Sequence, residues 1–294
     1  MLPLKDENPT TRAPVLTLLI MVACILVWFG PQATRGSEVI DTPAGAVRID
    51  SQLRFNLEYA AIPCEIQEAR PLELDEIAAF AAGVDEACGF DARTTPPFFP
   101  DKQARLAIIV SIFLHGGLLH LGGNMLFLWI FGNNIEDHLG HIRFALFYLA
   151  GGAVATLAHV AVQPDSTVPL VGASGAIAAI MGAYLVWFPD APIRTLVTVF
   201  IFDIRARWYL SGWFVFQFFT ATNSSVAWVT HVGGFLFGAL VGLFVRASRG
   251  TRRGVFTPEY QQPGWDPTGG AGPGPYPHPH PGAEPPRFGS RHWH

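Results

Sequence analysis

The sequence predicts an all-α, polytopic membrane protein built around six transmembrane helices. The chain has 294 residues, of which 50% are hydrophobic and only 14% charged, and its mean hydropathy is +0.31. This composition is too apolar for an ordinary soluble protein. Apolar runs of membrane-spanning length recur along the chain, and basic residues fall on alternate connections between them. The formal net charge of −4 is small and argues against nucleic acid as a partner.

The first apolar run covers residues 13–30 and follows a polar segment, residues 1–12. Its length suits one membrane crossing. A cleaved signal peptide is the competing interpretation, because a weak small-residue site follows at 31–33. The run is long for a signal sequence and that site is poor, so we expect a retained helix. A polar loop then covers residues 31–105. Within it, apolar residues at near-helical spacing over 72–81 predict either an interfacial helix or a small solvated helix packed on its own loop.

Five further spans are expected within residues 106–246. They cover about 116–133, 144–162, 171–188, 208–219 and 226–245. The run at 193–202 is also apolar, but charged residues follow it, so we place the fifth span after them. Residues 247–294 form a Pro- and Gly-rich tail that is expected to be disordered. Its histidines, at 278, 280, 292 and 294, are not expected to form a metal site.

The Lys and Arg residues of the short loops predict the orientation. Arginines follow the second, fourth and sixth spans, whereas the loops at 163–170 and 220–225 carry no Lys or Arg. Both termini are therefore expected in the cytoplasm of a cell-membrane protein, with the loop 31–105 outside. Cys64 and Cys88 lie in that loop, where they could pair or remain free thiols. Three cysteines are too few for a disulfide framework or a cysteine-based metal site.

Four polar residues fall at a similar depth in this topology. His120 and Asn124 lie in the first turns of the second span, and Ser174 opens the fourth. His231 lies in the second turn of the sixth span, which runs in the same direction. Strongly polar residues inside membrane spans are functional candidates, although a Gly-Ala-Ser-Gly sequence alone is also an ordinary helix-packing pattern. We therefore expect these side chains to meet just below the outer surface.

Glycines recur every fourth residue in the sixth span, at Gly234, Gly238 and position 242, beginning one turn after His231. Such a stripe allows close packing, here against the small residues of the fourth span. That packing would bring the His231 imidazole to the Ser174 hydroxyl, the minimum for covalent acyl transfer. The helix N-terminus at Ser174 favours an oxyanion. No Asp or Glu lies at this depth, so the expectation is a Ser–His dyad.

Three motifs resemble those of the rhomboid intramembrane serine proteases: HGGLLHLGGN at 115–124, GASG at 172–175 and HVGGFLFG at 231–238. They follow the family's order and spacing across residues 106–245. The resemblance implies a rhomboid-like six-helix bundle in the lipid bilayer that cleaves single-pass membrane proteins. It implies no metal and no organic cofactor.

The resemblance also implies roles for individual residues. Ser174 would be the nucleophile and His231 the general base and then acid. His120, Asn124 and the backbone N–H of Ser174 would stabilise the oxyanion. Supporting positions would be His115, Gly172, Gly175, Gly234 and Gly238, while Glu136 looks structural.

The chain departs from the family pattern at Ala178, where many members have an aromatic residue that stacks on the base histidine. His231 is then expected to be held by Trp228 or by closer helix packing. The outer loop also lacks the Trp-Arg pair often seen in the family. Substrate is expected to enter past the aromatic fifth span and the residues 220–225. Two alternatives remain: a catalytically inactive relative, and a transporter, although the internal repeats typical of transporters are not found.

Overall fold

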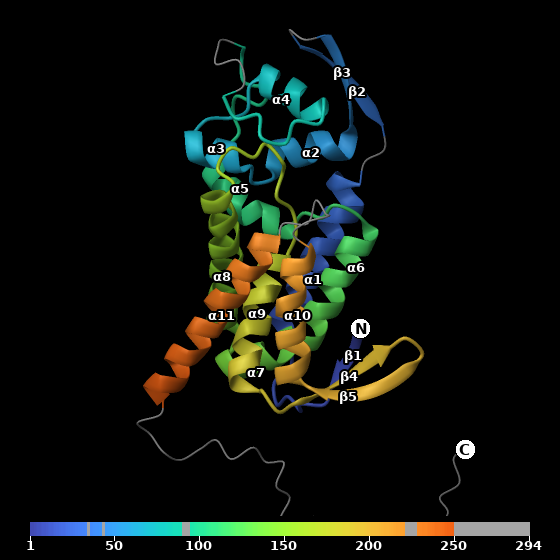
Figure 1. Cartoon of the computed structure of the whole chain (residues 1–294), viewed down its shortest axis with the longest axis vertical. Helices are drawn as coiled ribbons and strands as arrows, with labels where there is room; N and C mark the ends of the chain where they lie inside the picture. Colours follow the sequence, from blue (N-terminus) through green and yellow to red (C-terminus); the bar gives the residue numbers. More distant parts are fainter. Residues whose placement is uncertain (34–35, 43–44, 90–94, 221–227, 250–294) are drawn as a thin grey trace, which may run out of the picture. The chain divides into compact units, whose positions relative to one another are not determined.

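The computed structural model describes residues 1–33, 36–42, 45–89, 95–220 and 228–249 (Figure 1). Its predominant feature is a bundle of helices, which confirms the predicted fold class. The helices are α1 (Val15–Val27), α6 (Leu118–Phe127), α7 (Asn133–Leu139), α8 (His141–Val162), α9 (Ser174–Trp187), α10 (Ala206–Thr220) and α11 (Trp228–Arg249). A π-helical stretch, Leu128–Gly132, joins α6 to α7.

Several of these helices can cross a membrane. Within the described ranges, Val15–Gln32, His141–Val162 and Trp228–Ser248 are long and apolar enough, and Ala104–Phe113 with Leu118–Leu139 forms a pair bent by 78° that would make a fourth span. Helices α9 and α10 are shorter, with 14 and 15 residues. The chain is therefore a multi-pass membrane protein. A helix lies at each predicted span, and the count of six crossings stays a prediction.

The second helical run extends further than the sequence predicted, to Leu139 rather than residue 133. Its last turns carry the polar residues Asn134 and Glu136, which are buried rather than solvated. Glu136 accepts hydrogen bonds from the backbone N–H groups of Leu16 and Thr17, each at 2.8 Å. These are N–H groups of the first turn of α1, which lack a partner within their own helix. The polar end of this run thus caps α1.

Helix α9 forms the centre of the bundle. Every residue from Gly175 to Tyr184 is buried. Its small side chains let the neighbouring helices approach closely: Gly151 of α8 lies against Ala179, and Gly182 lies against the backbone of α11. Close helix contacts of this kind are the main source of packing energy where lipid removes the hydrophobic drive between helices. The candidate serine therefore opens the most enclosed helix of the described chain.

A three-stranded antiparallel sheet, which the sequence analysis did not predict, lies beside the bundle. Its strands are β1 (Leu2–Asp6), β4 (Pro192–Val197) and β5 (Phe200–Arg205), in the order β1-β4-β5. The apolar run at 193–202 is thus a hairpin rather than membrane-embedded helix. Strand β5 is mostly exposed and shows no in–out alternation in burial. Its aromatic and β-branched residues favour a strand, but an apolar run of this kind is also typical of a helix that crosses a membrane.

The loop expected at residues 31–105 folds into strands and helices at one end of the bundle (Figure 1), and its buried residues form a core of their own. It contains a hairpin of β2 (Ser37–Thr42) and β3 (Gly45–Asp50), then α2 (Ser51–Tyr59), α3 (Pro63–Glu68) and α4 (Leu74–Ala81). Helix α4 buries Ile77 in that core, together with Leu57 and Ile62. The helix expected at 72–81 is therefore of the second kind, packed on its own loop. Helix α5 (Ala104–Val110) follows.

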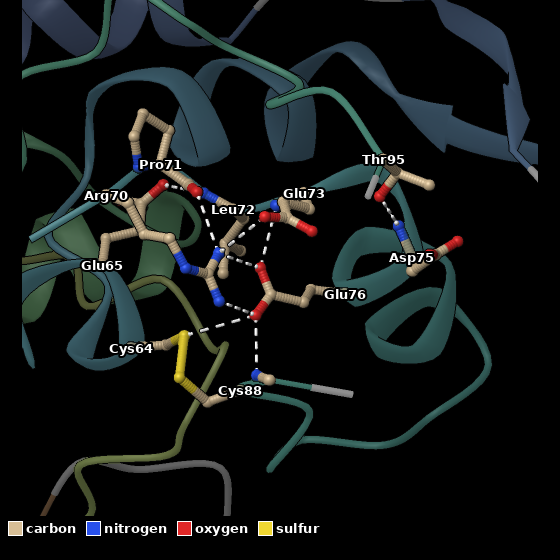
Figure 2. Close-up of polar contacts among 11 residues, drawn as sticks. Cys64, Glu65, Arg70, Pro71, Leu72, Glu73, Asp75, Glu76, Cys88 and Thr95 are labelled. Atoms are coloured by element: carbon tan, nitrogen blue, oxygen red, sulfur yellow. Dashed lines mark hydrogen bonds and ion pairs between the residues drawn. A yellow bond between two sulfur atoms is a disulfide. The ribbon is translucent and has the colours of Figure 1, made fainter. Parts of the chain in front are cut away.

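A disulfide and a buried carboxylate hold this loop together (Figure 2). Cys64 and Cys88 are paired, which settles the open question of the sequence analysis. Glu76 accepts two hydrogen bonds from Arg70, at 2.8 and 2.6 Å, and one from the backbone N–H of Gly89 at 2.8 Å. Burial alone would raise the pKa of Glu76, but these hydrogen bonds lower it below its ordinary value. Glu76 therefore binds Arg70 as a carboxylate.

Candidate active site

The site is built on a turn at Gly172 that precedes α9. Gly172 has a φ of +125°, a conformation that side-chain-bearing residues rarely adopt. Its N–H donates to the carbonyl of Ser111 at 3.0 Å, which fixes the turn. Helix α9 then begins at Ser174 with no side-chain cap. The first N–H groups of the helix and the positive end of its dipole are thus oriented toward this turn, as an anion-binding site requires.

Two side chains of α6 face the same turn. A methyl group built on Gly172 would lie 2.9 Å from His120 Nε2 and 3.5 Å from Asn124 Nδ2. The two residues are four apart and share one face of the helix. The structure thus brings His120 and Asn124 together at the residues that lead into Ser174. Gly172 has a second reason to be glycine, because a side chain there would displace His120.

Both of these side chains can donate a hydrogen bond toward the turn. The N–H of Gly116 donates to His120 Nδ1 at 3.2 Å, so Nδ1 is the acceptor and the neutral ring carries its proton on Nε2. Of the two ring nitrogens of His120, Nε2 is the one that lies close to Gly172. Asn124 Nδ2 is buried and has no hydrogen-bond partner within the described part of the chain. Buried donors normally have partners, so this amide is poised for an acceptor that arrives from outside.

Helix α11 packs on α9 in parallel and in constant register. Gly234 lies against the backbone of Gly175, Gly238 against that of Ala179, and Gly242 against that of Ala183. Extending this register by one turn toward the N-termini places His231 level with the turn at Gly172. By the same register Ser174 is level with position 233, so Ser174 and His231 lie within one helical turn of each other in height, on two helices in backbone contact. Both side chains are half-buried. The glycine stripe supplies the close packing that its spacing predicts.

His231 is held by a residue that the sequence analysis missed. Its Nδ1 lies 2.8 Å from Oε1 of Gln217 in α10, and its ring centroid lies 5.8 Å from that of Trp213. Of the two supports expected from the sequence, Trp228 packs with its ring centroid 5.7 Å from that of Phe218. A glutamine within the apolar helix α10 was the signal that could have identified this contact.

The other predicted positions have varied surroundings. His115 is fully buried, and its ring centroid lies 5.4 Å from that of His120. Gln32 binds the His115 backbone at both its N–H and its carbonyl, at 3.0 and 2.6 Å. Gly175 touches Thr230 of α11, where an added methyl group would lie 2.9 Å from the threonine methyl. His115 thus packs behind His120, and Gly175 belongs to the contact between α9 and α11.

One cluster outside this site resembles a metal site only in its donor atoms. Cys64, Cys88 and Glu76 have their ligand atoms within 4.8 Å of one another. The two sulfurs are bonded to each other, and the carboxylate binds Arg70. A disulfide has no thiolate to offer a metal. This cluster therefore stabilises the loop.

Comparison with known proteins identifies the region that contains these residues. A family model, the rhomboid domain, matches residues 102–248, half of the chain. That range contains Ser174, His231, His120 and Asn124.

Individual relatives agree with this match. The chain is 32% identical to RHOMBOID-like protein 5 of Arabidopsis thaliana over 166 residues, which are 56% of this chain and 52% of the relative. It is 30% identical to the mitochondrial rhomboid protein 1 of Saccharomyces cerevisiae, over 48% of this chain and 42% of the relative. It is 41% identical to the rhomboid protease GluP of Bacillus subtilis over 78 residues, 26% of this chain and 15% of the relative. The chain thus spans about half or less of the length of these relatives.

Proposed function

The chain belongs to the rhomboid family, and we propose from this premise that it is an intramembrane serine endopeptidase. Its substrates would be single-pass membrane proteins, cleaved within the lipid bilayer. The observation that carries the proposal is the parallel register of α9 and α11, which sets His231 level with the turn that leads into Ser174. We further propose that it acts in the cell membrane, with both termini cytoplasmic and the active site opening to the opposite side.

The first half of the reaction forms an acyl-enzyme. Ser174 Oγ attacks the carbonyl carbon of the substrate while its proton passes to His231 Nε2. The negative charge that develops on the carbonyl oxygen is stabilised by the Ser174 N–H, His120 Nε2–H and the Asn124 amide. Such preorganised donors each contribute about 3–4 kcal/mol to transition-state stabilisation. His231 then gives the proton to the leaving amine, and the C–N bond breaks.

The second half releases the acyl group. A water molecule gives a proton to His231 Nε2 and attacks the ester carbonyl carbon, and the same donors stabilise the second oxyanion. The bond to Ser174 Oγ breaks, and the serine recovers its proton from His231. The sum of the two halves is hydrolysis of one peptide bond.

Substrate entry is proposed beside α10. Phe216, Phe218 and Phe219 are exposed on this helix, as a surface that meets lipid or a substrate helix would be. Trp213 and Phe214 instead pack on Phe235 of α11, with centroids 6.1 and 4.8 Å apart. The segment 220–225, also expected to take part, lies almost wholly outside the described residues.

The test is cleavage of a transmembrane reporter in vesicles by the full chain and its variants. Ser174→Ala and His231→Ala should each abolish cleavage, whereas Ser211→Ala, at an exposed serine of α10, should leave it unchanged. A fluorophosphonate probe should label the wild type and not Ser174→Ala. Undiminished cleavage by Ser174→Ala would refute the proposal. Absence of both cleavage and labelling in the wild type would instead identify an inactive relative.

A further inference from the structure

We propose that Gln217 is a positioning residue for the catalytic base, so that Ser174, His231 and Gln217 act as a neutral triad. The inference rests on the proposed roles of Ser174 and His231. It adds a residue from a third helix to a site for which the sequence predicted only a dyad.

The hydrogen bond between Gln217 and His231 has a defined direction. Gln217 Nε2 donates to the carbonyl of Trp213, one turn earlier in α10, at 3.1 Å. This bond orients the amide so that its oxygen, Oε1, faces His231 Nδ1 at 2.8 Å. An amide oxygen can only accept, so Nδ1 must carry the proton. The other ring nitrogen, Nε2, is then unprotonated and can accept the proton of the Ser174 hydroxyl.

Burial gives this hydrogen bond its strength and rigidity. Gln217 is only 5% exposed, although its neighbours Phe216 and Phe218 are 59% and 48% exposed. A polar side chain oriented inward from an otherwise apolar helix is there for its hydrogen bonds, because hydrocarbon offers it no partner. A neutral amide is also easier to place at this depth than the carboxylate of an ordinary serine-protease triad, since a charge in the membrane is far more costly.

The chemical role follows from what the third member of a triad does. It holds the imidazole in the tautomer and orientation that leave Nε2 free, and it stabilises the imidazolium that forms. In a carboxylate triad, loss of the correct tautomer lowers kcat by about 10⁴-fold. An amide is neutral and supplies mainly the tautomer and orientation. We therefore expect a smaller effect for Gln217, on the order of 10²-fold.

The origin of Gln217 in α10 adds a mechanical consequence. The base lies on α11, while its positioning group lies on the helix proposed to border the substrate path. A displacement of α10 away from α11 would break the hydrogen bond and free the imidazole to rotate. The orientation of the base is thus tied to the position of α10 beside α11.

The kinetic test compares three variants of the full chain in vesicles. Gln217→Leu removes the acceptor at similar volume, and Gln217→Glu keeps an acceptor oxygen. Val154→Leu, at a residue of α8 that is 36% exposed, is the control. Gln217→Leu should lower kcat and the rate of fluorophosphonate labelling by about 10²-fold, with little change in KM or Tm. Gln217→Glu should restore only part of both rates and should lower Tm, because it keeps an acceptor oxygen but places a carboxyl group at a buried site. Val154→Leu should change neither rate.

A second measurement reads the tautomer without turnover. The ¹⁵N spectrum of the imidazoles, with His231→Ala to assign the signal, should report a protonated Nδ1 in the wild type and a loss of that preference in Gln217→Leu. The inference is overturned if this tautomer is absent from the wild type or unchanged in Gln217→Leu, or if Gln217→Leu cleaves like the wild type. Failure of the proposed function would give a different result. The protonated Nδ1 signal of His231 would still be lost in Gln217→Leu, although the wild type does not cleave the reporter.

Discussion

Gly234 of α11 lies so close to the carbonyl oxygen of Gly175 in α9 that a methyl group at position 234 would overlap it. The same is true of Gly238 and the carbonyl oxygen of Ala179, one turn further along. Backbone contact at both points sets the spacing between the helix that carries Ser174 and the helix that carries His231. The glycines therefore position the candidate base without touching the reacting atoms.

The first prediction concerns this spacing. Gly234→Ala and Gly238→Ala should push α11 away from α9, with a loss of about 1–3 kcal/mol of stability from overpacking. They should also reduce cleavage of the reporter, because acid–base catalysis depends on hydrogen-bond reach. Gly212→Ala is the matched control, since an added methyl group there meets no atom within 4 Å. Wild-type activity in Gly234→Ala would contradict this account of the packing.

The second prediction separates function from stability at Asn124. Its Nδ2 has no partner among the described residues, so Asn124→Ala should leave Tm unchanged or raise it. The same change should lower kcat by about 10²–10³-fold, the usual effect of losing an oxyanion donor. Asn134→Ala is the contrast, because Asn134 donates to the buried Asp6 and its loss should lower Tm. A parallel fall of Tm and kcat in Asn124→Ala would indicate a structural role instead.

The third prediction concerns the disulfide of the outer loop. Cys64 and Cys88 are 24 positions apart, and a cross-link of that length contributes about 3–4 kcal/mol in the chain-entropy account. Reduction, or the pair Cys64→Ala and Cys88→Ala, should therefore lower the Tm of the purified protein. In intact cells, both cysteines should resist alkylation until reductant is added. Ready alkylation without reductant would argue against the proposed extracytoplasmic loop.

The fourth prediction is a pH dependence at the other end of the bundle. Burial raises the pKa of Asp6 to about 6, although hydrogen bonds from Tyr184 and Asn134 oppose the shift. Between about pH 4 and 6 the folded protein keeps a proton that the unfolded chain has lost, so stability from this group falls as the pH rises through that window. Raising the pKa of Asp6 from 3.8 to about 6 corresponds to about 3 kcal/mol of folding free energy, which is lost above that window.

The variant Asp6→Asn keeps an acceptor oxygen but cannot ionise. The difference between the Tm of Asp6→Asn and that of the wild type should therefore be more positive at pH 7.5 than at pH 4.5. This difference should change mainly between about pH 4 and 6, where Asp6 ionises. Because both proteins share every other titrating group, the difference isolates Asp6. An equal difference at the two pH values would show that Asp6 does not titrate near 6.

Much of this protein could be predicted from the sequence because the signals are local. The apolar runs predict the helices, and the four-residue spacing of Gly234, Gly238 and Gly242 predicts which face of the last helix packs closely. The motifs around His120, Ser174 and His231 predict which residues share the site. Each of these signals is contained within a few helical turns, where composition and period determine the structure.

Only the tertiary structure decided the remaining features. Strand β1 pairs with β4 across about two thirds of the chain, with Leu2 opposite Leu196. The bond between His231 and Gln217 and the cap of α1 by Glu136 likewise join residues on different helices. In each case a polar group forms hydrogen bonds with a group that is distant in the sequence and adjacent only in the folded chain. The local sequence around one partner therefore does not specify the other. The sequence by itself therefore determined the helices and predicted the candidate reacting groups, whereas long-range hydrogen bonding, which burial makes obligatory, decided what holds them in place.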